Sequence, residues 1–363
     1  MLFHKYAEDI LQSGMLTLGK YTAQLEAQCS HIIGSRTAIA VNSGTSAIEI
    51  ALRSLKITNS EVIVPTNTFS ASAAAAILAG NKVRFVDIDP KTLCASRTTI
   101  EDSVTSATRA IILVHTAGII SPDTTKISEF CEKKGIKLIE DAAHAFGSKY
   151  QGRSAGTFGV AGCFSFYPTK VVTSGEGGLI VSDSPEIDTN ARVLRDQGKE
   201  SFNSNTVVKI GYNWRMSEFN AACGVITTRR IDEIVNRRNR IATIYNEILH
   251  REKRIEVIDT PIGCLNNYYK YVVLLQRGIN REQFKKEMKS QKSISCSGEV
   301  YSPPLHLQPV YMNLLGTKKG DYPTAEDVCE RMVCLPMYQT LDNKSAQYVA
   351  ESISEVIDSV NSK

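Results

Sequence analysis

The stretch that spans residues 138–181 constrains the fold of this chain more than any other part of the sequence. It contains the second half of one short apolar run, residues 136–139, and the whole of another, residues 163–166. Short apolar runs near Gly-rich segments are typical of parallel strands that are buried on both faces. Asp141 follows the first run and Lys170 the second. Because ligands of open α/β sheets bind outside the carboxyl ends of strands, neighbouring strands would bring these two residues to one ligand.

An aspartate and a lysine that meet around one ligand fit the chemistry of pyridoxal phosphate (PLP). The lysine amine forms a Schiff base with PLP, and the carboxylate keeps the pyridine nitrogen protonated, so that the ring accepts electrons from the substrate carbon. A simpler interpretation is a surface lysine and an aspartate that caps the next helix, and it is the more common one for an arbitrary pair. The two residues alone leave both interpretations open.

The surrounding motifs favour the first interpretation: EDAAH at 140–144, GTFG at 156–159, FSFYPTK at 164–170 and GEGG at 175–178. Together they resemble the central region of the DegT/DnrJ/StrS family of PLP-dependent sugar aminotransferases. The resemblance implies that Lys170 holds PLP as an internal aldimine and that Asp141 pairs with the pyridine nitrogen. It runs from about residue 20 to 335 and is strongest over 43–216. Compared with the family, the chain starts late, because a short arm usually precedes the first helix.

The same resemblance assigns three further residues of these motifs to the cofactor. Ala143 would lie behind the ring, and Ser165 would bind the phosphate. His144 stands where many family members have Gln, a group that hydrogen-bonds the ring hydroxyl. An imidazole can make that bond too.

Two earlier segments complete the expected cofactor site. A short strand at 38–41 leads into a turn and a helix, whose N-terminal amides and dipole favour an anion. Taken alone, this turn could equally be a plain helix cap. The resemblance assigns Gly44 and Thr45 to the PLP phosphate. It also implies that Phe69, which follows a strand at 61–64, stacks on the free face of the ring.

The segment GYNWRM at 211–216 resembles a family motif in which the Asn reaches the phosphate of a neighbouring subunit. We therefore expect Asn213 to act in trans, in a homodimer with shared active sites. Tyr301 and His306 lie in a stretch that resembles a family loop near the substrate. These two residues and Arg215 are the candidates for substrate contact.

The resemblance implies an α/β protein of PLP-dependent fold type I. Residues 1–250 would form a large domain with a mostly parallel seven-stranded sheet, an N-terminal helix and a long linking helix over 217–250. Residues 251–363 would form a small α+β domain with strands at 268–275 and 293–297. The strands expected in the large sheet are 38–41, 61–64, 83–88, 110–114, 136–139, 163–166 and 177–181.

The composition excludes several classes of function. The net charge of +4, from 42 basic and 38 acidic residues, gives no footprint of nucleic-acid binding. Nine cysteines without a C-x-x-C or a His/Cys cluster indicate no metal site and fit a reducing compartment. The N-terminus lacks the apolar core of a signal peptide, and no apolar run approaches the ~18 residues that cross a membrane. We expect a cytoplasmic protein without a membrane partner.

The expected reaction is transfer of an amino group from an amino acid, with L-glutamate as the first candidate, to a keto-sugar. A nucleotide-linked keto-deoxysugar is the favoured substrate, in amino-sugar or lipopolysaccharide biosynthesis. A sugar phosphate, a cyclitol or a keto-sugar acid stays open as the substrate. A PLP-dependent sugar dehydratase fits less well, because such family members replace the Schiff-base lysine. A non-catalytic regulator would not need Lys170 at all.

Overall fold

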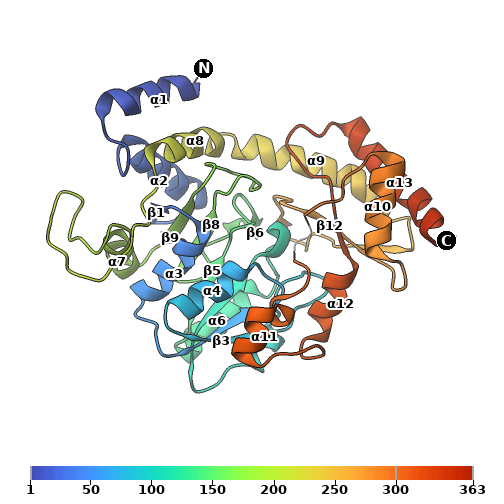
Figure 1. The fold of residues 1–363 in the computed structure, drawn as a ribbon, viewed down its shortest axis with the longest axis horizontal. Coiled ribbons are helices and arrows are strands. Elements are labelled where there is room, and N and C mark those ends of the chain that lie inside the picture. Colours follow the sequence, from blue (N-terminus) through green and yellow to red (C-terminus); the bar gives the residue numbers. More distant parts are fainter. Residues whose placement is uncertain (1, 299–300, 362–363) are drawn as a thin grey trace.

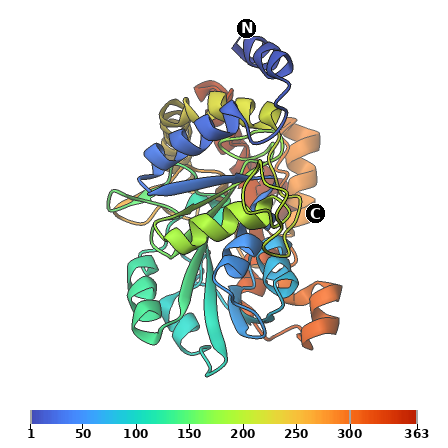
Figure 2. The ribbon, with the colours of Figure 1, turned by 90° about the vertical axis from the view of Figure 1, so that its left-hand side faces the viewer.

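The computed structural model describes residues 2–298 and 301–361. A seven-stranded sheet forms its centre, in the order β1-β9-β8-β5-β4-β2-β3, and helices lie on both sides of it (Figures 1 and 2). The predicted fold class is confirmed, with seven strands close to the expected positions. They are β1 (Thr37–Val41), β2 (Glu61–Pro65), β3 (Lys82–Val86), β4 (Thr108–Val114), β5 (Lys137–Asp141), β8 (Ala161–Ser165) and β9 (Gly178–Ser182).

All of these strands except β9 run in one direction. The neighbours β3, β2, β4, β5 and β8 pair in parallel. Strand β9 is antiparallel to β8 on one side and to β1 on the other, so β1 again points the same way as β8. The carboxyl ends of β1, β2, β5 and β8 therefore meet at one edge of the sheet.

The alternation of side chains along the strands divides the core into two layers. In β1, Ala38 and Ala40 pack with one cluster of buried residues, whereas Ile39 and Val41 pack with another. The first cluster contains residues of α2 (Lys20–Ile33) and α8 (Glu218–Thr228), and the second contains residues of α3, α4 and α7. The remaining helices of this half are α1 (Leu2–Ser13), α3 (Gly44–Ser54), α4 (Ser70–Leu78), α5 (Arg97–Glu101), α6 (Thr124–Lys134) and α7 (Pro185–Arg195).

The last third of the chain adds a smaller antiparallel sheet, β10-β12-β13. It packs with helices α9, α10 and α13 around a separate apolar cluster, at the right of Figure 1. Leu305 and Tyr311, although they belong to the last third of the chain, pack in the core of the large sheet. The predicted domain boundary at residue 250 therefore stays a prediction. The elements are α9 (Ile231–Leu249), β10 (Ile255–Val257), β12 (Tyr271–Leu275), α10 (Arg281–Lys292), α11 (Pro309–Leu315), α12 (Pro323–Arg331), β13 (Met332–Leu335) and α13 (Asn343–Asn361).

The expected linking helix over 217–250 is wrong, because two helices, α8 and α9, occupy this range. The hydroxyls of Thr227 and Thr228, in the last turn of α8, both donate to the carbonyl of Gly224. Thr227 also donates to the carbonyl of Thr173, at 2.8 Å. Hydroxyls that bond back to the backbone compete with the regular helix and favour its end at this point.

Two strand predictions in the last third also need correction. The strand expected at 268–275 begins only at Tyr271, because the side chains of Asn266 and Asn267 accept the N–H groups of Tyr268 and Tyr269 and hold them in a turn. Residues 293–297 form no strand.

Among the described residues, no helix combines the length and the apolar character needed to cross a membrane. Nor do three or more of the described His, Cys, Asp and Glu side chains gather in an arrangement that could hold a metal ion.

A buried carboxylate from one helix caps the start of another. Helix α2 follows Gly19, which has no side chain to offer as a cap. Glu218, at the start of α8 and 1% exposed, accepts hydrogen bonds from the N–H groups of Gly19, Tyr21 and Thr22 at 2.7–2.9 Å. The negative charge also complements the helix dipole. This one side chain thus satisfies the amides of Gly19 and of two residues in the first turn of α2, and it ties α2 to α8.

The variant Glu218→Gln should destabilise the protein, because it removes the charge and replaces one acceptor oxygen with a second donor. We expect the free energy of unfolding to fall by about 2–3 kcal/mol. Urea unfolding followed by circular dichroism measures the change. Glu200→Gln is the matched control, because Glu200 is exposed and its carboxylate contacts no partner in the described chain. Equal midpoints for both variants would contradict the capping role.

Candidate active site

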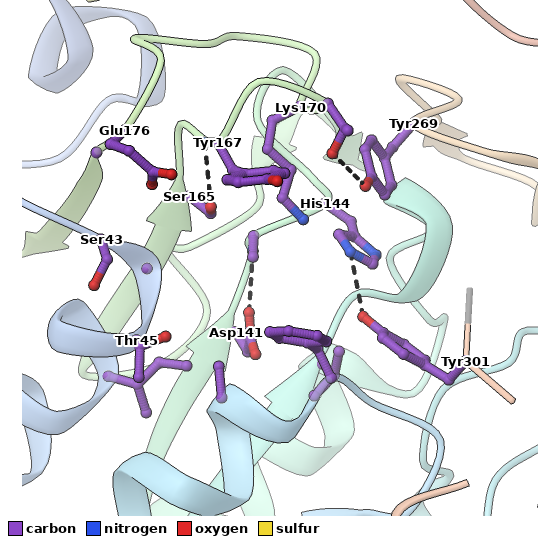
Figure 3. Close-up of a pocket in the computed structure, with 18 of the residues that line it drawn as sticks. Ser43, Thr45, Asp141, His144, Ser165, Tyr167, Lys170, Glu176, Tyr269 and Tyr301 are labelled. Carbon is purple, nitrogen blue, oxygen red and sulfur yellow. Dashed lines mark hydrogen bonds between the residues drawn. The ribbon is translucent and has the colours of Figure 1, made fainter. Parts of the chain in front are cut away.

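A cavity of about 560 Å³ opens where β1, β5 and β8 end. Figure 3 shows side chains from these strand ends pointing into it. The structure brings together nine residues that the sequence predicted for the site. They are Gly44, Thr45, Phe69, Asp141, Ala143, His144, Ser165, Lys170 and Tyr301.

Asp141 is the last residue of β5 and is only 5% exposed. One carboxylate oxygen accepts a hydrogen bond from the Ser72 hydroxyl at 2.6 Å, and the other accepts from the N–H of Ala143 at 3.1 Å. These bonds hold the carboxylate in one orientation at the cavity wall. A carboxylate in this position can pair with a cationic nitrogen in the cavity.

Lys170 follows β8, and its side chain enters the cavity from the wall opposite Asp141 (Figure 3). Its ammonium lies 4.6 Å from the centroid of the Tyr269 ring. Burial, opposed by Asp141 and assisted by the nearby Lys270, lowers the pKa of Lys170 to about 8. At pH 7 about a tenth of this amine is therefore uncharged, as a nucleophile or a proton acceptor must be, and the fraction rises with pH.

His144 lines the cavity, is 8% exposed and is held as a neutral ring. Its Nδ1 accepts a hydrogen bond from the N–H of Ala117 at 3.3 Å, so the proton of the neutral ring lies on Nε2. Burial, followed by the charges of Lys170 and Lys270, holds the pKa of His144 well below its ordinary value. Nε2 lies 3.2 Å from the hydroxyl of Tyr301. His144 can therefore donate a hydrogen bond into the cavity.

The start of α3 forms a small cradle beside Ser165. The Ser43 side chain accepts the N–H of Ser46, whereas the amides of Gly44 and Thr45 find no acceptor within the described chain. A Cβ at position 44 would lie 2.9 Å from the Cβ of Ser165, so only glycine lets the helix approach this closely. Two free amides, a helix dipole and a hydroxyl together suit an oxyanion.

Phe69 and Ala143 complete the cofactor set. Phe69 caps α4 at the cavity and is 64% exposed, so its ring is open to stacking by a ligand. Ala143 also lines the cavity, two residues beyond Asp141. The roles of both residues stay predictions.

Three predicted residues do not line the cavity. Asn213 is exposed on the long segment after α7, where a single bridge pairs it with Asp196. Arg215 donates to the carboxylate of Asp196 at 2.6 Å. An exposed Asn213 is compatible with the expected role in a neighbouring subunit.

His306 cannot contact a substrate in this structure. Its ring is 0% exposed, with Nδ1 2.8 Å from the Thr66 hydroxyl and Nε2 2.9 Å from the carboxylate of Glu326. Both ring nitrogens are therefore occupied. The structure gives His306 a packing role, and the expected substrate contact is corrected accordingly.

The cavity contains further residues that the sequence reasoning did not assign. Tyr167, Thr169 and Glu176 line it, and all three stand inside the motifs at 164–170 and 175–178. The motifs themselves could have indicated them.

Tyr269 and Lys270 also line the cavity, although no motif marked them. The hydroxyl of Tyr269 lies 3.1 Å from that of Thr169, which is 100 residues earlier in the chain. An aromatic and a basic residue inside the predicted strand 268–275 carry no distinctive signal, so only the tertiary structure reveals them.

A second buried acid supports the cavity from behind. Glu140 is 0% exposed and accepts the N–H groups of Gly156 and Gly159, each at 2.7 Å. It also lies 2.7 Å from Nε2 of His115. The GTFG motif thus wraps around Glu140, and the buried His115 packs against the same carboxylate.

Comparison with known proteins identifies relatives over nearly the whole chain. The profile of the DegT/DnrJ/EryC1/StrS aminotransferase family matches residues 2–354. A GDP-perosamine synthase of Escherichia coli O157:H7 is 32% identical over 97% of this chain and 94% of its own. The pleiotropic regulatory protein of Geobacillus stearothermophilus is 34% identical over 96% and 92%. The PLP form of Spr1654 from Streptococcus pneumoniae superposes with a TM-score of 0.91 and 27% identity, over 99% and 96%.

The fold, the cavity and these relatives define a PLP-dependent aminotransferase of fold type I. More specifically, the chain belongs to the DegT/DnrJ/EryC1/StrS aminotransferase family.

The residues of the cavity fit PLP. The cradle at Gly44 and Ser165 suits the phosphate, the buried Asp141 suits the pyridine nitrogen, and the partly neutral Lys170 suits the aldehyde. His144 supplies a neutral donor for the ring hydroxyl. Together these residues suit a group that carries an anion, an aldehyde and a basic ring nitrogen, with the aldehyde and the nitrogen on opposite sides of the ring.

The low pKa of Lys170 predicts the pH dependence of cofactor capture by the apoprotein. Only the uncharged amine attacks the aldehyde, so the capture rate should rise with pH and level off above a midpoint of about 8. Stopped-flow absorbance after addition of PLP measures this rate. Free Nα-acetyl-lysine is the control, because an exposed amine titrates at about 10.4. A midpoint equal to that of the control would contradict the effect of burial.

Proposed function

We propose that this aminotransferase moves an amino group from L-glutamate to a nucleotide-linked keto-sugar. The observation that carries the proposal is the cavity in which Lys170, Asp141 and the Gly44 cradle converge. The sugar substrate is supported by similarity to a GDP-perosamine synthase, whose name records a product linked to a nucleoside diphosphate. Amino-sugar synthesis for a cell-surface polysaccharide is the corresponding biological role.

The proposed roles follow from charge and position. PLP, when bound, stabilises the negative charge that develops on the substrate carbon. Lys170 would take the proton from this carbon and deliver it across the transferred nitrogen to the cofactor carbon on its other side, because a pKa of about 8 leaves part of its amine uncharged. The Asp141 carboxylate faces the cavity in a fixed orientation, because the Ser72 hydroxyl and the N–H of Ala143 donate hydrogen bonds to its two oxygens. His144 donates a hydrogen bond from Nε2 without changing its protonation state.

The absorption spectrum of the holoenzyme tests the amino donor. Addition of L-glutamate should convert the bound cofactor to its amine form, and a nucleotide-linked keto-sugar should reverse the change. Lys170→Ala should retain less than about a thousandth of the turnover, because no other group occupies its position. Lys149→Ala, at an exposed lysine outside the cavity, is the matched control.

Three outcomes would redirect the proposal. A spectrum that ignores glutamate would reject this donor. Reversal by a sugar phosphate or a keto-sugar acid, and not by a nucleotide sugar, would favour the non-nucleotide substrates. A wild-type protein that binds no PLP would favour a regulatory role, which the name of the Geobacillus stearothermophilus relative also records.

We further propose that the enzyme works as a homodimer in which Asn213 completes the site of the partner. The supporting observation is a set of apolar side chains that a single chain leaves exposed. They lie on α1 and on the long segment after α7, which both extend from the body of the molecule (Figure 1). They are Leu2, Phe3, Leu11, Val207, Val208 and Ile210. Exposed apolar groups of this extent are typical of protein interfaces.

Subunit complementation tests the role of Asn213. Lys170→Ala and Asn213→Ala chains should each be impaired as homodimers, because every site then lacks one residue. A heterodimer of the two should regain about half of the wild-type activity, since one of its sites combines the intact Lys170 with the intact Asn213. Differently tagged chains allow its purification. Activity no higher than the mean of the two homodimers would place Asn213 in its own subunit's site.

A further inference from the structure

The charges of the active-site cavity do not balance around Lys270. The ionisable acids that line the cavity are Asp141 and Glu176. Asp141 is held by Ser72 and Ala143. No carboxylate within the described part of the chain lies within 4 Å of the Lys270 nitrogen. Lys270 therefore presents a cation to the cavity that no acid of the described chain neutralises directly.

The position of Lys270 is set by its neighbours. Its nitrogen lies 5.3 Å from the centroid of the Tyr269 ring, the ring that Lys170 approaches at 4.6 Å. The aromatic face attracts both cations. On another side lies Gly298, where a Cβ would come within 2.8 Å of the Lys270 nitrogen. Glycine at this turn thus leaves room for the ammonium beside the cavity.

Lys170 and Lys270 share one aromatic neighbour, the ring of Tyr269. Both nitrogens lie near a single aromatic ring, so a molecule that reacts at Lys170 can extend an anionic group to Lys270. An uncompensated cation in a partly enclosed cavity attracts such groups strongly, because the surroundings screen it less than water does.

We propose that Lys270 forms an anion-binding subsite of the cavity, which holds a carboxylate or a phosphate of the substrate while the reaction proceeds at Lys170. The inference rests on the proposed function, since it assumes that an amino acid and a nucleotide sugar enter this cavity. The carboxylate would come from the amino donor and the phosphate from the sugar nucleotide. A single ammonium can serve both in turn, because the two substrates bind at different times.

Isothermal titration of the holoenzyme tests the subsite without turnover. The two probes are glutarate, which has the carboxylates of glutamate without the amine, and GDP. Lys270→Met should weaken the binding of at least one probe by about tenfold or more, whereas Lys270→Arg should retain most of it. Lys91→Met is the matched control, because Lys91 is exposed and lies outside the cavity.

The outcomes separate the two sources of the anion. Loss of glutarate binding alone identifies the donor carboxylate, and loss of GDP binding alone identifies the phosphate. Unchanged binding of both probes by Lys270→Met would overturn the subsite, as would an equal loss in Lys270→Arg or a wild-type enzyme that binds neither probe at millimolar concentration. These results do not depend on whether glutamate changes the spectrum, so failure of the proposed function is recognised separately.

A second measurement distinguishes an electrostatic role from a structural one. The charged or titratable groups that line the cavity with Lys170 are Asp141, Glu176, Lys270, His144 and the phenols of Tyr167, Tyr269 and Tyr301. Lys270 is the cation among them, and it lowers the pKa of Lys170. In Lys270→Met apoprotein the midpoint of PLP capture should therefore shift to higher pH. An unshifted midpoint would contradict the electrostatic role.

Discussion

The shared direction of β1, β2, β5 and β8 is the constraint on which the active site depends. Because these strands end at one edge of the sheet, four separate segments deliver their next residues to the same volume. Strand β9 is the one strand of this sheet that runs in the opposite direction. Because β9 is antiparallel to both β8 and β1, β1 points the same way as β8 and the other strands. The topology of the sheet thus brings Gly44, Phe69, Asp141 and Lys170 to one cavity.

Three buried acids show how differently one functional group can be used. Glu218 accepts the amides at the start of α2, and Glu140 accepts those of the GTFG motif. Both carboxylates organise backbone and face no ligand. Asp141 is also oriented by neighbouring donors, but it lies at the cavity wall. The hydrogen bonds from Ser72 and Ala143 therefore orient the Asp141 carboxylate toward a ligand in the cavity.

Most of the fold was predictable, because each strand of the large sheet is a compact apolar run followed by a turn. The predictions were wrong where the local sequence pattern does not reveal a hydrogen bond that competes with the expected structure or contact. The helix over 217–250 divides because Thr227 and Thr228 bond back to Gly224. Histidine is a common residue in active sites, yet the Thr66 hydroxyl and the Glu326 carboxylate occupy both ring nitrogens of His306. Thr66 lies 240 residues from His306, and no spacing within the chain reveals that contact.

The sequence by itself was enough to predict the site residues at the ends of β5 and β8, from Asp141 to His144 and from Ser165 to Lys170. The preceding strand fixes where the residues of such a segment lie. Residue type and spacing in the sequence are therefore sufficient to predict which of them reach the site. Only the tertiary structure brought Tyr269 and Lys270 to the same cavity, and with them the second cation beside Lys170. Contacts between segments a hundred residues apart depend on how whole layers pack, and that packing is a property of the complete fold.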